Sequence, residues 1–280
     1  MPYIAVNGVE HFYQWVSGSF DRAKPTMVFV HGWGGSCRYW QSTAEALSEQ
    51  FNGLLYDMRG FGRSQAKGDA DKSEQDYELV TFADDLAELL NQLKLDKVYL
   101  NAHSMGASVA AFFLNRYGDR VEKAILTCNG IFEYDKAAFE AFYRFGGYVV
   151  AFRPKWLAKV PLAPRIFMAR FLHQAVPREI KQAFLEDFLA ADYDTALGTI
   201  FTAVSKTAVD TMPQEFAQIS VPTLLVSGQY DQITPAKLGA EAAALNSKIE
   251  YLLVPSTGHF PMLEDAATYL EGVNHFLATA

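Results

Sequence analysis

One serine, one aspartate and one histidine, far apart in the chain, have the side-chain chemistry of a nucleophilic active site. They are Ser104, Asp231 and His259. A serine hydroxyl is a weak nucleophile until a histidine accepts its proton, and a carboxylate holds the imidazole in the required tautomer. Each of the three lies just after a short apolar run that is typical of a buried β-strand. The sequence therefore offers one residue for each role, provided that the fold brings them together.

Ser104 is the centre of residues 102–106, Ala-His-Ser-Met-Gly, which join a predicted strand to a predicted helix. A serine on such a sharp strand-to-helix turn needs small residues two positions before and two after it, and Ala102 and Gly106 meet that demand. The free N–H groups of the following helix would favour negative charge beside the hydroxyl. The alternative is a serine that caps an ordinary helix.

A glycine-rich loop, Gly32-Trp33-Gly34-Gly35, follows another apolar run at residues 26–31. Glycines allow backbone N–H groups to approach a ligand closely, so the loop is a candidate for half of an oxyanion hole, with Trp33 N–H as one donor. The alternative is a tight turn into the helix predicted over residues 38–48.

The order of the predicted elements indicates a parallel sheet. Further strands are expected at 53–57, 97–101, 121–127, 221–227 and 249–254, with helices at 80–93, 107–117, 235–245 and 264–277 and an opening hairpin at 3–17. Alternating strands and helices give parallel strands with right-handed crossovers. Ligands bind at the carboxyl ends of such strands, where the glycine loop, Ser104, Asp231 and His259 all fall.

The composition limits the class of protein. The chain has 280 residues, half of them hydrophobic, which suits one large α/β domain or one domain with an insertion. A net charge of -8 argues against a nucleic-acid partner, and the two cysteines, Cys37 and Cys128, are too few for a disulfide framework or a zinc cage. We expect a cytoplasmic protein, because no signal peptide or apolar run long enough to span a bilayer is evident. We also expect neither a metal nor a cofactor.

These motifs together resemble the α/β-hydrolase family. The resemblance lies in the order Ser, acid, His, in the His31-Gly32 loop, and in Asp-x-Arg-Gly-x-Gly-x-Ser at residues 57–64. It implies an α/β fold with a mostly parallel central sheet and helices on both faces. It covers residues 1–129 and 216–280 as the core, and implies that residues 130–215 are an inserted helical cap.

The resemblance also implies residue roles. Ser104 is the nucleophile, His259 the general base and then acid, and Asp231 the orienting acid, while the N–H groups of Trp33 and Met105 form the oxyanion hole. The chain departs from the family pattern at Ala102, where glycine is usual, and has Asn129 where some members place the acid. We expect Asp57 and Arg59 to brace their loop, His31 to shape the glycine loop, and the ring of His103 to point away from the nucleophile.

The predicted cap differs in composition from the rest of the chain. Eight aromatic residues suggest either an apolar pocket or a well-packed helical lid: Phe142, Tyr143, Phe145, Tyr148, Phe152, Trp156, Phe167 and Phe171. Residues 141–178 hold seven Lys and Arg and no Asp or Glu, whereas the remainder has 17 basic and 32 acidic residues. The segment could therefore contact an anionic lipid surface, receive an acidic substrate, or only spread long basic side chains over an apolar lid.

The function expected from these observations is hydrolysis of a hydrophobic carboxylic ester through an acyl-enzyme. Cofactor-free haloperoxidases or perhydrolases, carbon-carbon bond hydrolases and lactonases use the same three residues and remain alternatives. Dehalogenases and epoxide hydrolases of this family attack with Asp, and this chain has Ser104. An alternative of another class is a ligand receptor that keeps the three residues but signals through its cap.

Overall fold

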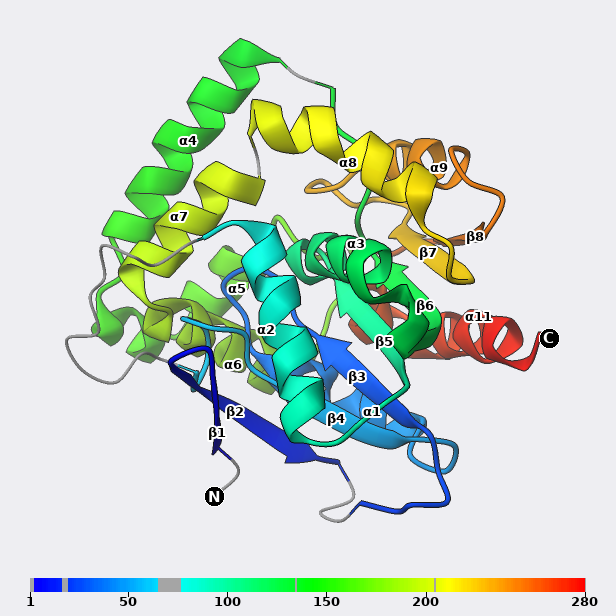
Figure 1. Ribbon diagram of the computed structural model, residues 1–280. Helices are drawn as coiled ribbons and strands as arrows, with labels where there is room; N and C mark the ends of the chain where they lie inside the picture. The colour runs from blue at the N-terminus through cyan, green and yellow to red at the C-terminus, as the bar shows by residue number, and fades with distance from the viewer. Residues whose placement is uncertain (1–2, 17–19, 65–76, 134, 204, 280) are drawn as a thin grey trace.

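The computed structural model describes residues 3–16, 20–64, 77–133, 135–203 and 205–279, without the side chains of Ala138 and Phe142. Within these residues, eight strands form one sheet in the order β1-β2-β4-β3-β5-β6-β7-β8. They are β1 (Tyr3–Val6), β2 (Val9–Trp15), β3 (Thr26–Val30), β4 (Asn52–Tyr56), β5 (Val98–His103), β6 (Val121–Thr127), β7 (Thr223–Gly228) and β8 (Ile249–Val254). β3 to β8 are parallel, so the predicted mostly parallel sheet is confirmed (Figure 1).

The opening hairpin is the antiparallel part of the sheet. β1 pairs with β2, and β2 pairs antiparallel with β4. Asn7 and Gly8 connect the two strands with φ of 45° and 80°. A two-residue hairpin turn requires such positive values, which asparagine and glycine tolerate best. The hairpin turn predicted from Asn7-Gly8 is therefore confirmed.

β3 shows that helices cover both faces of the sheet. Val28 and Val30 belong to the core that α2 and α3 cover, whereas Met27 and Phe29 belong to the core on the other face, which α1 and α11 cover. A strand that is buried on both faces has a nearly continuous apolar sequence, and β3 has such a sequence. The helices on the two faces span Leu79–Gln92 (α2), Met105–Tyr117 (α3), Gln41–Ala46 (α1) and Ala266–Ala278 (α11).

The remaining helices of these layers are short. They are η1 (Cys37–Trp40), η3 (Gly118–Arg120), α9 (Ala236–Ala243) and α10 (Pro261–Glu264). The closing helix predicted over residues 264–277 is confirmed as α11, which begins after Asp265, and the short helix α10 precedes it. Asp265 has non-helical φ and ψ of -141° and 75°, and its side chain accepts the Thr268 N–H to cap α11.

The described part of the chain between β6 and β7 is helical. It contains α4 (Lys136–Ala151), η4 (Lys155–Lys159), α5 (Ala163–Met168), α6 (Arg178–Ala190), α7 (Tyr193–Ala203) and α8 (Lys206–Gln218). The segment 130–215, predicted to be a cap, falls within this part and is called the inserted segment below. α8 packs against α3, and its Met212 and Phe216 join the core on that face of the sheet.

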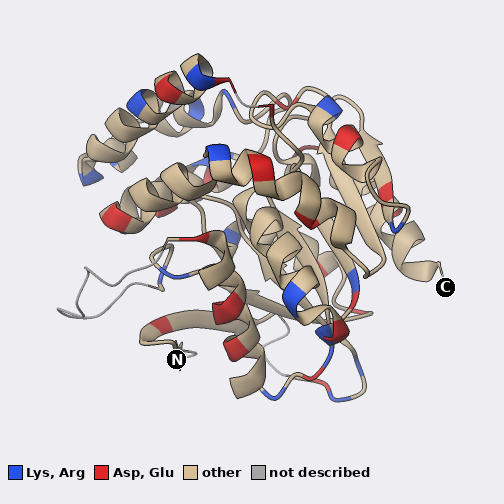
Figure 2. Cartoon of the chain, turned by 45° about the horizontal axis from the view of Figure 1, so that its top comes forward, with Lys and Arg blue, Asp and Glu red and all other residues tan. Residues whose placement is uncertain are grey.

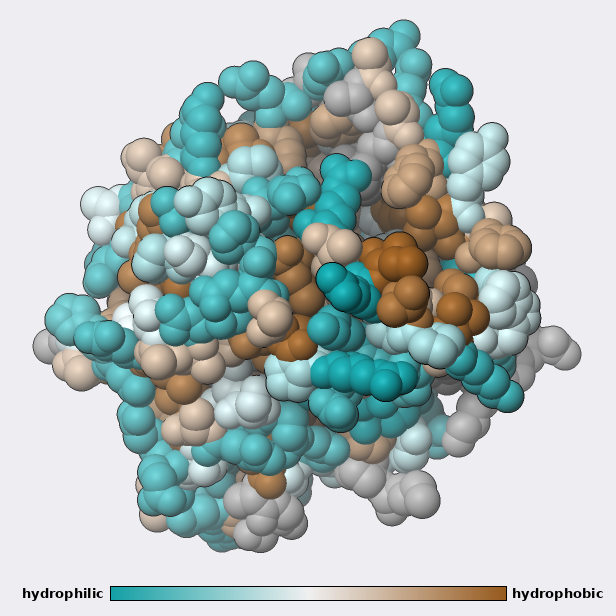
Figure 3. All heavy atoms as spheres, turned by 180° about the vertical axis from the view of Figure 1, so that it is seen from behind, coloured by the Kyte–Doolittle hydropathy of each residue, from teal (hydrophilic) through white to brown (hydrophobic). Residues whose placement is uncertain are grey.

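The outer surface of the inserted segment is unusually apolar. In α4, at the upper left of Figure 2, the charged residues are Lys136, Glu140 and Arg144, and none occurs from Phe145 to Ala151. Seen from behind, the side of the molecule that carries α5 has exposed hydrophobic surface bordered by strongly hydrophilic side chains (Figure 3). None of the described helices is long and apolar enough to span a lipid bilayer.

Candidate active site

Ser104 occupies the turn between β5 and α3 with a strained backbone. Its φ is 54° and its ψ is -124°, a conformation that non-glycine residues rarely adopt. Hydrogen bonds hold the turn on both sides, since the Ser104 N–H donates to the Thr127 carbonyl oxygen at 2.8 Å and its carbonyl oxygen accepts from the Ala107 N–H at 2.8 Å. The side chain of Ser104 is thereby fixed at the carboxyl end of β5.

Small residues around this turn are a steric necessity. A Cβ added to Gly106 would lie 2.3 Å from the His31 carbonyl oxygen, and one added to Gly32 would lie 3.0 Å from the Cβ of Ser104. Ala102 is fully buried at the end of β5. The prediction that residues 102 and 106 must be small agrees with this packing, and the glycine loop lies directly against Ser104.

The structure brings Ser104, His259 and Asp231 into one hydrogen-bonded chain. His259 Nε2 lies 3.0 Å from Ser104 Oγ, and His259 Nδ1 lies 2.7 Å from Asp231 Oδ2. Because a carboxylate only accepts hydrogen bonds, the proton is on Nδ1, and Nε2 presents its lone pair to the hydroxyl. The imidazole is therefore in the tautomer that can accept a proton from Ser104.

The backbone after β7 orients the carboxylate of Asp231. Its Oδ1 accepts the N–H groups of Ile233 at 2.7 Å and Thr234 at 3.0 Å, which leaves Oδ2 for His259. Asp231 is buried, so a carboxylate without these donors would be costly. The side chain is thus held in one orientation before any substrate arrives.

The N–H groups of Trp33 and Met105 are both available beside Ser104. Met105 is the first residue of α3, so its N–H has no partner inside the helix. Within the described residues neither N–H donates a hydrogen bond to the backbone. Trp33 follows Gly32, which is packed against Ser104, and Met105 directly follows Ser104 in the chain.

His103 has a structural connection to His259 that the sequence did not reveal. Its Nε2 lies 2.7 Å from the carbonyl oxygen of His259, and its Nδ1 lies 3.0 Å from the hydroxyl of Tyr39. Nε2 therefore donates, and Nδ1 accepts from the hydroxyl, whose oxygen in turn accepts the Gly32 N–H. Burial and the neighbouring His259 hold the pKa of His103 well below its usual range, which keeps the ring neutral.

Glu264 also holds the histidine loop, and sequence reasoning did not find it either. Its Oε1 accepts the N–H groups of Gly258 and Phe260, on either side of His259, at 2.9 and 3.1 Å. Its Oε2 accepts those of His173 and Gln174 in the inserted segment at 2.6 and 2.7 Å. One buried carboxylate thus joins the loop of His259 to the inserted segment.

His31 shapes the glycine loop, as expected from the sequence. Its Nε2 accepts the Met58 N–H at 2.9 Å, so Nδ1 carries the proton and donates to the Gly32 carbonyl oxygen at 2.8 Å. Burial lowers the pKa of the ring, which favours this neutral form. His31 therefore links the loop after β3 to the turn after β4.

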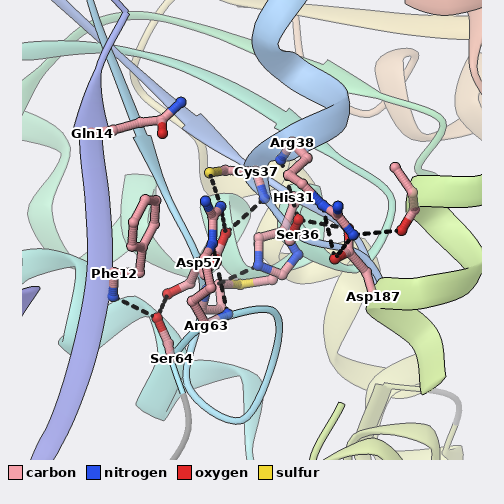
Figure 4. A network of polar contacts seen from close by, with 12 residues as sticks. Phe12, Gln14, His31, Ser36, Cys37, Arg38, Asp57, Arg63, Ser64 and Asp187 are labelled. Atoms are coloured by element: carbon pink, nitrogen blue, oxygen red, sulfur yellow. Dashed lines mark hydrogen bonds and ion pairs between the residues drawn. The ribbon is translucent and has the colours of Figure 1, made fainter. Parts of the chain in front are cut away.

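Asp57 braces the same region and takes no part in the chain of Ser104, His259 and Asp231. Its carboxylate accepts the N–H groups of Cys37 and Arg63 and the guanidinium of Arg63 (Figure 4). Burial would raise the pKa of Asp57, but these hydrogen bonds and the charge of Arg63 outweigh it and hold the pKa below its usual value. Arg59 pairs with Asp85 instead, which also agrees with a bracing role.

An ion pair joins the glycine loop to helix α6. The Arg38 guanidinium donates to Asp187 Oδ1 from Nε at 3.0 Å, and Ser36 Oγ donates to Asp187 Oδ2 at 2.6 Å (Figure 4). Burial raises the pKa of Asp187, against the effect of Arg38 and Ser36. The inserted segment is therefore anchored to the core both here and at Glu264.

Comparison with known proteins identifies the family. The family model described as the alpha/beta hydrolase fold matches residues 25–266. The chain belongs to the α/β-hydrolase family. This hydrolase is 29% identical to a non-heme chloroperoxidase of Kitasatospora aureofaciens, over 90% of either chain. It is 26% identical to the pimeloyl-[acyl-carrier protein] methyl ester esterase of Vibrio cholerae, over 89% of this chain and 93% of the relative.

The fold of the hydrolase is also that of a solved esterase. The esterase from Exiguobacterium antarcticum superposes with a TM-score of 0.80, covering 99% of both chains at 21% identity. At this identity the likeness concerns the fold alone. The family match and the curated relatives show that the protein is an α/β-hydrolase enzyme, without fixing its substrate.

One group of metal-ligand side chains occurs among the described residues of the hydrolase. Ligand atoms of His103, Cys128 and His259 lie within 4.8 Å of one another. Both ring nitrogens of each histidine are already engaged, with Tyr39 and a carbonyl oxygen in one case and with Ser104 and Asp231 in the other. Burial raises the pKa of Cys128 well above its usual value, which disfavours the thiolate that a metal requires. The group does not fit a metal site.

Two groups can be distinguished among the aromatic residues of the inserted segment. The ring of Phe171 lies 6.0 Å from that of His259, and Phe167 and Trp33 pack on Phe188 with centroids 4.7 and 5.5 Å away. These aromatic rings therefore lie close to His259 and to the glycine loop. A second set faces solvent: Phe145, Tyr148, Phe152 and Trp156. The prediction that the aromatics form a pocket or a packed lid is wrong for this set, and the Phe142 side chain lies outside those that the structure describes.

Proposed function

We propose that this enzyme hydrolyses hydrophobic carboxylic esters through an acyl-enzyme on Ser104. The observation that carries the proposal is the position of the His259 ring, which is within hydrogen-bond distance of both the Ser104 hydroxyl and the Asp231 carboxylate. This arrangement converts an alcohol into a nucleophile at neutral pH. The proposal assigns nucleophile, base and orienting acid to these three residues.

The reaction follows from the geometry in two halves. Ser104 Oγ attacks the ester carbonyl while His259 Nε2 accepts the hydroxyl proton, and the N–H groups of Trp33 and Met105 donate to the oxyanion. His259 then gives its proton to the departing alkoxide, leaving an ester of Ser104. In the second half His259 deprotonates a water molecule that attacks this ester, and the carboxylic acid is released with the hydroxyl restored.

The surroundings of the site favour an apolar substrate. Phe171 lies beside His259, and Trp33, whose N–H is a proposed oxyanion donor, packs on Phe188. Such rings stabilise an acyl or alkyl chain by removing its surface from water, at about 25 cal/mol per Å². We therefore propose esters with a hydrophobic acyl group in preference to charged ones.

The experiment is a panel of p-nitrophenyl esters of graded acyl length, measured with the wild-type enzyme and with Ser104→Ala. We expect multiple turnovers by the wild type and a loss on the order of a millionfold in Ser104→Ala. Turnover beyond one equivalent separates an enzyme from a receptor that is acylated once. Equal rates in the two proteins would refute Ser104 as the nucleophile.

A second candidate reaction is peracid formation, which the similarity to the chloroperoxidase favours. Hydrogen peroxide in place of water would attack the acyl group on Ser104, releasing a peracid and restoring the hydroxyl without a redox cofactor. Acetate and hydrogen peroxide, with oxidation of a halide as the readout, test this reaction. Peracid formation that exceeds ester hydrolysis would make it the principal activity.

A further inference from the structure

Large apolar side chains that face solvent are concentrated in one stretch of the inserted segment. Among the described residues, sixteen large hydrophobic side chains are exposed, and seven of them fall within residues 145–166, with exposed fractions between 37% and 71%. These seven define the α4–α5 patch: Phe145, Tyr148, Phe152, Trp156, Val160, Leu162 and Ile166. Single exposed hydrophobics are normal, but a contiguous group indicates an interaction surface.

The spacing of these residues places them on outward faces. Phe145, Tyr148 and Phe152 are three and four residues apart, on or directly after α4, and so share one side of its helix. Leu162 and Ile166 share a side of α5 in the same way. The inward side chains of this stretch, Val149, Leu157, Ala163 and Phe167, pack in one small core with α6. The α4–α5 patch is therefore the outer surface of that core.

The cations around the α4–α5 patch have no acidic neighbours in the sequence. Residues 141–178 contain seven Lys and Arg and no Asp or Glu. Arg144, Lys155, Lys159, Arg165 and Arg170 are exposed, and none forms an ion pair with an acid in the described part of the chain. Arg153 differs, since its guanidinium donates to backbone carbonyl oxygens of Val150 and Phe188. Hydrophobic surface bordered by hydrophilic side chains is visible on this side of the molecule in Figure 3.

Charge decides which partner fits this surface. Residues 141–178 have a net charge of +7, whereas the rest of the chain, with 17 basic and 32 acidic residues, has a net charge of -15. A symmetric dimer through the patch would place like charges opposite each other. Exposed apolar side chains among lysines and arginines are instead the chemistry that binds the interface of a membrane with anionic lipids. Tyr148 and Trp156 are the residue types that prefer the headgroup level.

We propose that the α4–α5 patch docks this enzyme on the surface of an anionic lipid bilayer. The apolar side chains enter the headgroup region, and the surrounding cations contact lipid phosphates. The same segment touches the active site, because the carbonyl oxygen of its Phe171 accepts the N–H of His259 at 2.7 Å. Docking would therefore hold the site close to esters dissolved in the membrane. The docking itself does not depend on the chemistry of Ser104.

Vesicle sedimentation with Ser104→Ala tests the proposal, because this variant cannot consume lipid. Vesicles of phosphatidylcholine alone are compared with vesicles that also contain phosphatidylglycerol. We expect binding to the mixed vesicles that weakens with added salt, and little binding to the neutral ones. Absence of binding to both, or equal binding to both, would overturn the proposal.

Charge variants assign the binding to this surface. In Lys155→Gln, Lys159→Gln and Arg165→Gln together, the partition coefficient should fall roughly a hundredfold, since each cation near an anionic surface contributes about fivefold. The matched control is the triple variant Lys97→Gln, Lys237→Gln and Lys248→Gln, which removes three exposed cations outside the patch. Its partition coefficient should differ from that of the Ser104→Ala parent by only a few-fold. Similar losses in both triple variants would show that net charge, and not the patch, is responsible.

Two further measurements distinguish insertion of the α4–α5 patch into the membrane from dimerisation of the protein through the same surface. Trp156 should shift its fluorescence to the blue on mixed vesicles, and Trp156→Phe should remove that shift while Trp15, Trp33 and Trp40 remain. Sedimentation equilibrium without lipid should give a monomer. A dimer that the patch variants Leu162→Ser and Ile166→Ser abolish would assign the surface to a second copy of the chain and contradict the proposal.

Discussion

The imidazole Nε2 of His103 donates a hydrogen bond to the backbone carbonyl oxygen of His259, 2.7 Å away. The residue before the proposed nucleophile thus holds the residue proposed as its base. Through Tyr39 the same ring is connected to Gly32 in the glycine loop. Three loops from different parts of the sequence are fixed to one another by a single neutral side chain.

His103→Phe should therefore lower the kcat of ester hydrolysis more than it lowers the amount of folded enzyme. The aromatic ring preserves packing but leaves the His259 carbonyl oxygen and the Tyr39 hydroxyl unpaired. A displacement of the base by about 1 Å costs on the order of a hundredfold. The measurement is kcat per titrated active site, with His275→Phe on the exposed face of α11 as control.

Tyr39→Phe removes only the hydroxyl from this connection and should have a smaller effect on kcat than His103→Phe. A purely structural role would lower the fraction of titratable sites in both variants and leave kcat per site unchanged. That result would show that His103 does not position His259 for catalysis.

Glu264→Gln should destabilise the fold and disturb the loop of His259. The glutamine amide would direct N–H groups toward two of the four backbone N–H donors that the carboxylate now satisfies. Two unpaired buried donors cost at least about 2 kcal/mol of unfolding free energy. Urea denaturation measures this loss, and Glu250→Gln, exposed on β8, is the matched control. Equal stability of the two variants would show that Glu264 does not hold these loops together.

Asp57→Asn should make the stability of the protein less dependent on pH at the acidic end. A carboxyl whose pKa is lower in the folded state contributes stability above its unfolded value of about 3.9, and loses it as the pH falls through the folded pKa. Removing the buried carboxylate that pairs with the partly exposed Arg63 should cost about 1–3 kcal/mol at pH 7 and less near pH 3.

Denaturation of the Asp57→Asn variant and wild type at both pH values measures this difference. Asp84→Asn, whose pair with Arg116 is exposed, should change stability by less than about 1 kcal/mol at either pH. A loss for Asp57→Asn that is the same at both pH values would contradict the lowered pKa.

Gly106→Ala should impair both folding and catalysis because there is no room for its Cβ. The added carbon would lie 2.3 Å from the His31 carbonyl oxygen, so α3 must move away from β3 and take Ser104 with it. We expect a loss of about 1–3 kcal/mol in unfolding free energy and a reduced kcat. In Gly147→Ala in α4, the added Cβ would have no atom within 4 Å apart from its chain neighbours and the backbone of its own helix. This variant should instead stabilise the protein by about 0.5–1 kcal/mol. Unchanged activity in Gly106→Ala would show that the turn tolerates a larger residue.

The sequence predicts the fold and the three polar side chains well, because each depends on local signals. Ser104 is recognisable from the small residues beside it, and Asp231 and His259 from the strands that precede them. No local sequence signal identifies His103 or Glu264, since their partners include backbone groups that are distant in the sequence, those of His259 and of His173 respectively. The aromatic residues of α4 could not be assigned to an inner or outer face, because apolar residues occur on both sides of that helix.

The most direct test of the account is the kinetics of Ser104→Ala, His259→Ala and the double variant on the best ester of the panel. Residues that act as one unit are not additive, so each single variant should lose on the order of a millionfold in kcat and the double variant no more than either. Losses that multiply in the double variant, or a single variant that keeps substantial turnover, would contradict the proposed catalytic unit.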